Sequence, residues 1–205
     1  MRSRNYAPPS RLAPYIARHS VFSVEAPDDF ELTDTLLAET AMVRLLLRGD
    51  WTTETAPGEW TSFGRTVFCG PNSRPLRVRV RGGFRVIGVA LCPACWRAFP
   101  DVPADRITDT ILPVSGFWGE RTGALFRDVS AIGRDDAKGD AEIVAVVERH
   151  MHDLLDERGW PAPDTAMPVS LPEITLLAPA AGPPMVLFGV SERMMPAVLA
   201  IAAVP

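Results

Sequence analysis

The sequence is short of three features that would assign it to a class: cysteine, long apolar runs, and excess charge of one sign. Three cysteines in 205 residues, without an export signal, do not indicate the disulfide framework of a secreted protein. The basic stretch 1–16 has no apolar run of signal-peptide length, and the late run 194–205 is too short and proline-bounded to span a bilayer. The net charge of −4 gives no general attraction for nucleic acid or anionic lipid. We therefore expect a soluble cytoplasmic protein without a membrane partner.

Catalytic motifs are scarce as well. The chain has no G-x-S-x-G nucleophile turn, no phosphate-binding glycine loop and no paired-carboxylate motif. Its three histidines are His19, His150 and His152, and the last two, only two positions apart on an expected helix, point to different sides. These residues predict neither an enzyme nor a bound cofactor, and we expect no catalytic residues.

One short stretch raises the question of thiol chemistry. Residues 91–96 read LCPACW, and a pair such as Cys92 and Cys95 can be a redox site or half a zinc site. A thioredoxin-type pair lies in a βαβ unit, whereas the residues before Cys92 resemble strands of a hairpin. A zinc site needs about four ligands, and neither Cys69 nor the histidines supply a second pair at ligand spacing. We favour two small buried cysteines where a strand meets a short helix, and redox or metal binding is the weaker alternative.

The first 92 residues are rich in strand patterns. The stretches VFSVEA (21–26), MVRLLLRG (42–49) and TVFCG (66–70) have the aliphatic and β-branched content of short strands. Residues 74–91, RPLRVRVRGGFRVIGVAL, predict a hairpin that turns at Gly82 and Gly83. Several strands without long helices between them favour a small β-barrel or sandwich.

Five arginines gather in this hairpin. Because three of them alternate with apolar residues on one strand, they share a face that could hold an anionic ligand or be solvated. No aromatic residues interleave on that face of the strand, as single-stranded nucleic acid would require, so we favour a solvated face. The five are Arg74, Arg77, Arg79, Arg81 and Arg85.

The period of the apolar residues changes near residue 93 and becomes helical. Residues 122–133 and 140–159 each place their apolar side chains on one stripe, with Asp140 as an expected N-cap and Gly133 and Gly159 as expected stops. The fold class is therefore α+β, with a β-barrel or sandwich followed by two or more helices. The stripes consist of Leu125, Phe126, Val129 and Ile132, and of Ile143, Val144, Val147, Met151, Leu154 and Leu155.

The last segment, 161–205, is unlike the rest. It holds nine prolines and four charged residues, so it cannot form a long helix and is too apolar for a solvated linker. We expect one domain over 5–160 and an irregular Pro/Ala-rich tail over 161–205.

Three stretches, taken in order, resemble the N-terminal sensory domain of AraC-type bacterial transcription regulators. They are YAPPSRLAPYIARH (6–19), the stretch 68–99 with Gly70-Pro71, and the stretch 102–126. The last of these matches a family signature at Ile107, Thr108, Asp109, Pro113 and Gly119. The resemblance covers about residues 6–158.

The resemblance implies a cupin-like β-barrel that senses a small molecule or mediates dimerisation, followed by two helix-turn-helix units that bind promoter DNA. The implied partners are an unknown small-molecule effector, promoter DNA for an intact family member, and a second copy of the chain. No effector-binding residues carry over, and the spaced His/Glu ligands of metal-binding cupins are not apparent. A stand-alone cupin-type binding protein or enzyme is the alternative.

The chain departs from the family after the long helix, where the Arg-rich helix-turn-helix half is expected. Only LFGVSERMM (187–195) resembles the start of a recognition helix, in which Ser191 would cap the helix and Arg193 would contact DNA. Pro196 would end that helix, and Arg193 alone cannot supply the phosphate contacts that DNA binding needs. We therefore expect the DNA-binding half to be truncated or scrambled, for instance by a shift of reading frame. The alternative for residues 187–195 is a chance match of a few residues within the tail.

Overall fold

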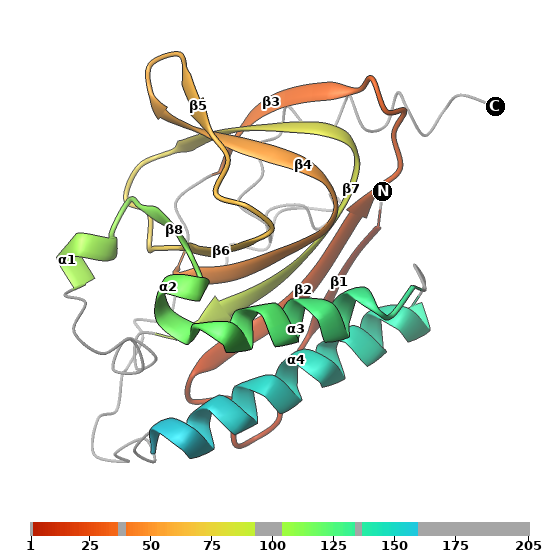
Figure 1. The fold of residues 1–205 in the computed structure, drawn as a ribbon, viewed down its shortest axis with the longest axis vertical. Helices are drawn as coiled ribbons and strands as arrows, with labels where there is room; N and C mark the ends of the chain where they lie inside the picture. Colours follow the sequence, from red (N-terminus) through yellow and green to blue (C-terminus); the bar gives the residue numbers. More distant parts are fainter. Residues whose placement is uncertain (1, 37–39, 93–103, 134–136, 160–205) are drawn as a thin grey trace, which may run out of the picture.

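The computed structural model describes residues 2–36, 40–92, 104–133 and 137–159 (Figure 1). The strands of this part form one eight-stranded antiparallel sheet, and helices α2 to α4 follow it in sequence. The strands are β1 (Arg2–Tyr6), β2 (Ile16–Val24), β3 (Glu31–Leu36), β4 (Met42–Ala56), β5 (Glu59–Thr61), β6 (Thr66–Cys69), β7 (Leu76–Leu91) and β8 (Ile111–Pro113). The helices are α1 (Ala104–Ile107), α2 (Ser115–Trp118), α3 (Glu120–Ser130) and α4 (Ala137–Arg158).

Two long strands, β4 and β7, run side by side through the centre of the sheet. The main path through the sheet is β1-β2-β7-β4-β6-β8, while β3 pairs with β7 and β5 pairs with β4. Each long strand therefore changes neighbour along its length: β7 pairs with β3 through its first half and with β2 through its second. The sheet bends where the neighbours change, and its upper part curls over its lower part (Figure 1).

The hairpin predicted over residues 74–91 is wrong. Residues 76–91 form the single strand β7, and Gly82 and Gly83 bend it without reversing it. Gly82 has φ +65°, and Gly49 on the neighbouring β4 has φ +84°, a conformation that glycine adopts without strain. A Cβ at Gly49 would lie 2.8 Å from Phe84 Cβ, so the two bent strands approach closely there. A Gly-Gly pair between two apolar runs is compatible with a turn or with a bend. Which of the two forms depends on the strands that pair with those runs.

Side chains alternate between the two faces of this bent sheet. The face toward the helices is packed against α2, α3 and α4 in one large core that includes Val43, Leu45, Ile87 and Val89. The concave face holds a smaller cluster of buried residues, Phe22, Val24, Leu46, Val80 and Phe84. The sheet is thus one layer that separates two apolar regions.

The helical stripes predicted from the sequence are confirmed. In α4 all six predicted residues are buried, and in α3 Leu125 and Val129 are buried while Phe126 packs partly against the same core. Ile132 also packs against this core but lies beyond α3, which ends at Ser130, so Gly133 is not the residue that stops the helix. Gly159 follows the end of α4 with φ +54°, as expected of a stop. Asp140, however, is not the N-cap, because α4 already begins at Ala137. Among the described residues, no helix has both the length and the apolar character needed to cross a membrane.

The predicted fold class, α+β with a sheet followed by helices, is confirmed, although the sheet does not close into a barrel. Strands β1, β3, β5 and β8 were not anticipated. Residues 93–103, with Cys95 and the expected short helix, and the tail 161–205 lie outside the described residues.

Candidate functional site

The concave face of the sheet contains a cavity. The space within it that the centre of a water molecule can occupy is about 60 Å³. One water molecule needs roughly 10–15 Å³ measured in this way, so the cavity admits more than a single water molecule. Its wall is formed by residues of four strands: Phe22, Asp34, Thr35, Leu36, Arg44, Leu46, Trp51, Val78, Val80, Phe84 and Val86.

The bend of the sheet places these side chains around one space. The inward residues of β7 are every second one, Val78 and Val80 before the bend and Phe84 and Val86 after it. In β4, Leu46 lies before the bulge at Arg48 and Trp51 after it, and both line the cavity. A flat sheet would hold these residues in one plane, so the bend is what creates the cavity.

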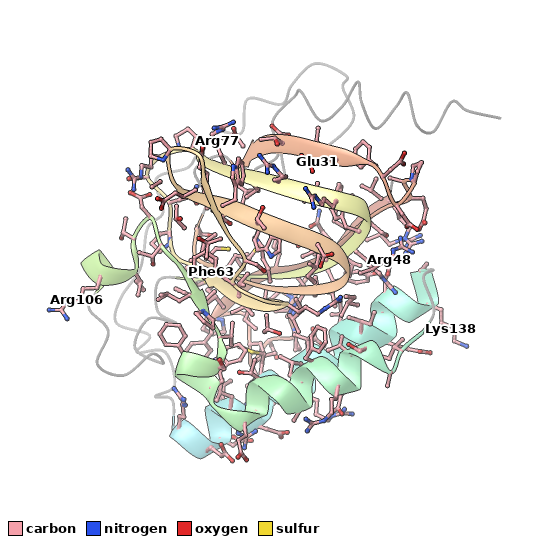
Figure 2. The ribbon with its side chains drawn as sticks, turned by 45° about the horizontal axis from the view of Figure 1, so that its top comes forward. Glu31, Arg48, Phe63, Arg77, Arg106 and Lys138 are labelled. Carbon is pink, nitrogen blue, oxygen red and sulfur yellow. The ribbon has the colours of Figure 1, made fainter. Side chains whose placement is uncertain are left out.

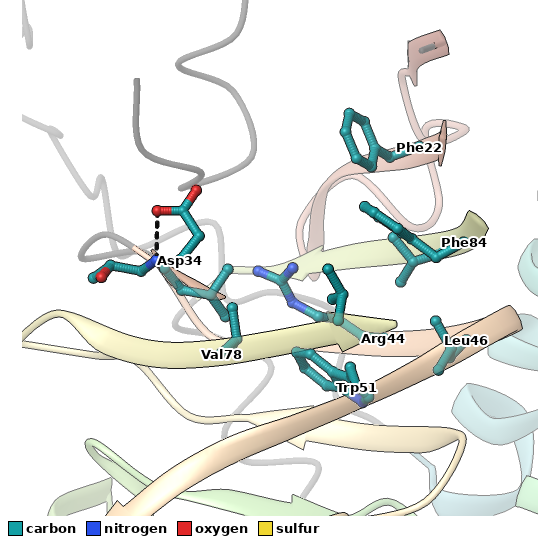
Figure 3. A pocket seen from close by; sticks show the side chains of 11 residues that line it. Phe22, Asp34, Arg44, Leu46, Trp51, Val78 and Phe84 are labelled. Carbon is teal, nitrogen blue, oxygen red and sulfur yellow. Dashed lines mark hydrogen bonds between the residues drawn. The ribbon is translucent and has the colours of Figure 1, made fainter. Parts of the chain in front are cut away.

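Two charged residues lie among these apolar walls. Arg44 on β4 and Asp34 on β3 are each 8% exposed, and both line the cavity (Figure 3). The backbone N–H of Thr35 donates to Asp34 Oδ1 over 2.7 Å. Buried ionised groups are retained only where hydrogen bonds or opposite charges offset their lost hydration. The cavity therefore combines a hydrocarbon wall, which includes three aromatic rings, with one cation and one anion of opposite hydrogen-bonding roles.

This arrangement suits the binding of a small molecule. Ligand sites in proteins are typically concave and mostly apolar, with a few polar groups that fix orientation. The sequence analysis did not identify Asp34 or Arg44 as site residues. The available signal was that each charge occupies an inward position of a strand, as in MVRLLLRG, where Arg44 lies among aliphatic residues.

On the opposite face of the sheet, three arginines converge on one carboxylate. Asp140 in the first turn of α4 is completely buried, and its Oδ1 lies 2.6 Å from an Arg85 Nη2 donor. Arg4 Nη1 donates to its Oδ2 over 2.5 Å, and Arg2 Nε lies 3.3 Å from the same oxygen. Asp140 thus joins α4 to β1 and to β7, and its carboxylate reaches the sheet instead of capping the helix.

His19 lies in the same interface between sheet and helix. Its side chain is fully buried, and its Nε2 is 3.4 Å from Glu148 Oε1 of α4. Burial lowers the pKa of His19 to about 4, and burial also raises the pKa of Glu148. His19 is therefore buried and neutral between the sheet and α4 near pH 7.

The arginine stripe on β7 is offset by acidic neighbours. Arg77 donates to Glu54 over 2.6 Å and Arg81 donates to Glu31 over 2.7 Å, while Arg79 lies 3.5 Å from Glu31. Figure 2 shows Arg77 and Glu31 on the outer side of the upper sheet, away from the helices. These ion pairs favour a solvated face over an anion-binding site.

The residues that resemble the AraC-type signature hold two loops together. Asp109 accepts hydrogen bonds from the backbone N–H and the hydroxyl of Ser73, each over 2.7 Å. These bonds and one from the Arg74 N–H hold the pKa of Asp109 below its ordinary value. A Cβ at Gly70 would lie 1.5 Å from the Ile107 carbonyl oxygen, so only glycine fits there. The signature residues Asp109 and Gly70 therefore position loops and do not line the cavity.

The two cysteines that the structure describes, Cys69 and Cys92, show no sign of an activated thiol. Cys69 is buried, Cys92 is partly buried, and burial raises the pKa of the Cys92 thiol, whereas catalytic thiols have a lowered pKa. Among the described residues, no three His, Cys, Asp or Glu side chains lie close enough together to hold a metal ion. Cys95, Ser191 and Arg193 lie outside the described residues, so the roles predicted for them stay predictions.

The model of one protein family matches residues 4–113 of this chain. The family is described as "Domain of unknown function (DUF6597)". The matched segment contains the strands from β2 to β8 and most of β1, and therefore the whole cavity, but it ends before α2. No curated protein matches the sequence.

Proposed function

We propose that this chain, which belongs to the DUF6597 family, is the ligand-sensing part of an AraC-type transcription regulator. The observation that carries the proposal is the cavity inside the bent sheet, lined by Arg44, Asp34 and apolar side chains. The ordered resemblance over residues 6–158 supports it, as does the occurrence of domains of this family in AraC-type regulators. In this function the chain binds its ligand and does not transform it.

The architecture offers a short route from the cavity to the helices. Phe84 and Val86 line the cavity, while Arg85 between them crosses to the other face and bonds Asp140 of α4. Phe22 on β2 also lines the cavity, and its neighbour Val21 belongs to the core under the helices. A ligand that shifts these strands would therefore change the packing of α4 across a single layer of backbone.

In this proposal, the helices transmit ligand binding from the sheet to the rest of the protein. In an intact AraC-type regulator the DNA-binding half follows the sensory domain in sequence, and in this chain α4 is the last element that the structure describes. We propose that ligand occupancy alters how α4 is held, and thereby alters promoter binding in an intact family member or pairing with a second copy of the chain.

A screen of small metabolites by thermal shift tests the sensing function. A molecule that binds only the folded state raises the unfolding midpoint, by an amount that grows with its concentration over Kd. The full chain is compared with Val80→Phe, which fills the cavity, and with Ala145→Phe, which adds the same ring on the exposed face of α4.

We expect at least one compound to stabilise the original chain and Ala145→Phe but not Val80→Phe. Compounds that stabilise all three chains equally would bind elsewhere. That result, or the absence of any stabilising compound across a broad library, would contradict the proposal that the cavity is a sensing site.

A further inference from the structure

The wall of the cavity is mostly hydrocarbon. Of the described residues that line it, all but Asp34, Thr35 and Arg44 are aliphatic or aromatic. The two charged residues also interact with other groups of the chain. The apolar part of the wall, which comes from β2, β3, β4 and β7, therefore decides which molecules gain by entering the cavity.

Water is held weakly against such a wall. A water molecule inside a protein needs about two to four polar partners, and the side chains of Val78, Val80 and Phe84 offer none. When an apolar group displaces such water, the water regains its hydrogen bonds in bulk solvent and the apolar group gains dispersion contacts with the wall. Both changes favour the binding of an apolar molecule.

One side of the cavity is entirely apolar in its side chains. Figure 3 shows Phe22 and Phe84 together on this side, with Asp34 on the opposite side. The centroids of the two rings are 5.4 Å apart, and both rings pack in one buried cluster with Leu46 and Val80. A polar group placed among these side chains would lose its hydration without gaining a hydrogen bond from them. An apolar group placed there would contact hydrocarbon from several strands.

We infer that the cavity selects a predominantly apolar ligand, whose apolar end lies among Phe22, Leu46 and Phe84. This inference rests on the proposed sensing function and names the ligand class of that site. The affinity of such a ligand comes from the hydrocarbon that it buries, so the affinity rises with the length of the ligand until the cavity is filled.

A homologous series of uncharged alcohols measures the contribution of hydrocarbon. Butan-1-ol, pentan-1-ol and hexan-1-ol share one hydroxyl and differ only in their CH₂ groups. Each is titrated into the full chain, and binding is followed through the methyl NMR signals of Val78 and Val86, which line the cavity. We expect Kd to fall by about fourfold for each added CH₂, which corresponds to about 0.8 kcal/mol.

A diol of the same length tests the apolar end of the ligand. Pentane-1,5-diol is as long as hexan-1-ol but carries a hydroxyl in place of the terminal methyl. We expect the diol to bind at least about tenfold more weakly, because a hydroxyl would then lie among side chains that offer it no hydrogen bond. This comparison uses the original chain and does not depend on the folding of a variant.

A change in the wall shows where the alcohols bind. Val80→Thr keeps the shape of the side chain but adds a hydroxyl to the wall, so it should weaken the binding of hexan-1-ol by at least about threefold. Val146→Thr makes the same change on α4, on the other face of the sheet, and should leave the affinity unchanged. Thermal unfolding of both variants shows that they are folded.

The outcomes separate this inference from the function on which it rests. Equal or tighter binding of the diol at Val78 and Val86, or no gain along the alcohol series, would overturn the inference and leave the sensing site intact. Equal affinity of Val80→Thr and the original chain for hexan-1-ol would also overturn it.

Methyl signals that respond to none of the alcohols would overturn the inference as well, and the metabolite screen then decides about the function. A metabolite that stabilises the original chain but not Val80→Phe would preserve the sensing site. The lack of any such metabolite would contradict both the inference and the sensing function.

Discussion

The two faces of the central sheet bury similar residues, but one face is closely packed and the other leaves a cavity. Leu45 and Leu46 are neighbours on β4; Leu45 belongs to the core under the helices, whereas Leu46 lines the cavity. Helices α3 and α4 form a second layer that packs against the face of the sheet that carries Leu45. Among the described residues, no helix packs against the concave face, and the side chains of the curved sheet leave space at its centre.

The charged residues are also arranged differently on the two faces. On the helix face, three arginines surround one fully buried carboxylate at hydrogen-bonding or ion-pair distance. On the cavity face, one arginine and one aspartate lie beside open space. The helix face is therefore closely packed with its buried carboxylate paired, whereas the cavity face leaves space beside its charged residues.

The largest effect on the free energy of unfolding is expected from removing the charge of Asp140, which the arginines of the helix face share. Asp140→Asn keeps the size of the side chain but removes the negative charge that the arginines around it share, and Arg85 is only 6% exposed. Loss of one partner from a buried ionic group costs about 3–5 kcal/mol, so the free energy of unfolding should fall by that amount in urea titrations. Asp153→Asn, an exposed change on the same helix, is the control and should be close to neutral. Equal stability of the two variants would contradict the role given to Asp140.

The second prediction concerns the two leucines. Leu45→Ala should cost about 4 kcal/mol, because it opens a cavity in a core that cannot collapse around it. Leu46→Ala should cost about 2 kcal/mol, since its side chain already borders open space and loses fewer contacts. Denaturant unfolding of both variants measures the difference directly. If Leu46→Ala were the more damaging change, the cavity face would have to be as well packed as the helix face.

The third prediction is a dependence of stability on pH through His19, whose net size is reduced by a neighbouring carboxyl group. Its pKa of about 4 in the folded chain lies below the ordinary 6.5, so the unfolded chain binds the proton more readily. His19 therefore contributes stability above pH 6.5 that is lost as the pH falls toward 4, up to about 3 kcal/mol. The raised pKa of Glu148 acts in the opposite direction and reduces the net loss.

A pair of pH titrations measures this contribution. Unfolding free energies of the original chain and of His19→Gln are compared at several values between pH 7 and 4. The original chain should lose more stability on acidification than the variant does. Parallel curves would mean that His19 does not titrate in the interface.

Part of the fold followed from local pattern. The apolar stripes of α3 and α4 were predicted residue by residue, because a 3.6-residue period survives in any context that buries one side of a helix. The Gly82–Gly83 turn was predicted wrongly, because glycine permits a reversal and a bend alike. The short strands β1, β5 and β8 have few apolar residues in alternation and exist through the strands they pair with.

By itself, the sequence determined the order of strands before helices, the buried stripes of α3 and α4, and the resemblance that suggested a sensory domain. Those properties depend on neighbours within a few positions, or on motifs that can be read in order. Only the tertiary structure decided that Asp34 and Arg44, ten residues apart in the sequence, line one cavity with Phe84. It also decided that Arg4 and Arg85 meet Asp140 through the other face of the sheet. The physical reason is that strand pairing and the bend at Gly49 and Gly82 fix which distant side chains share a space, and no local pattern records that.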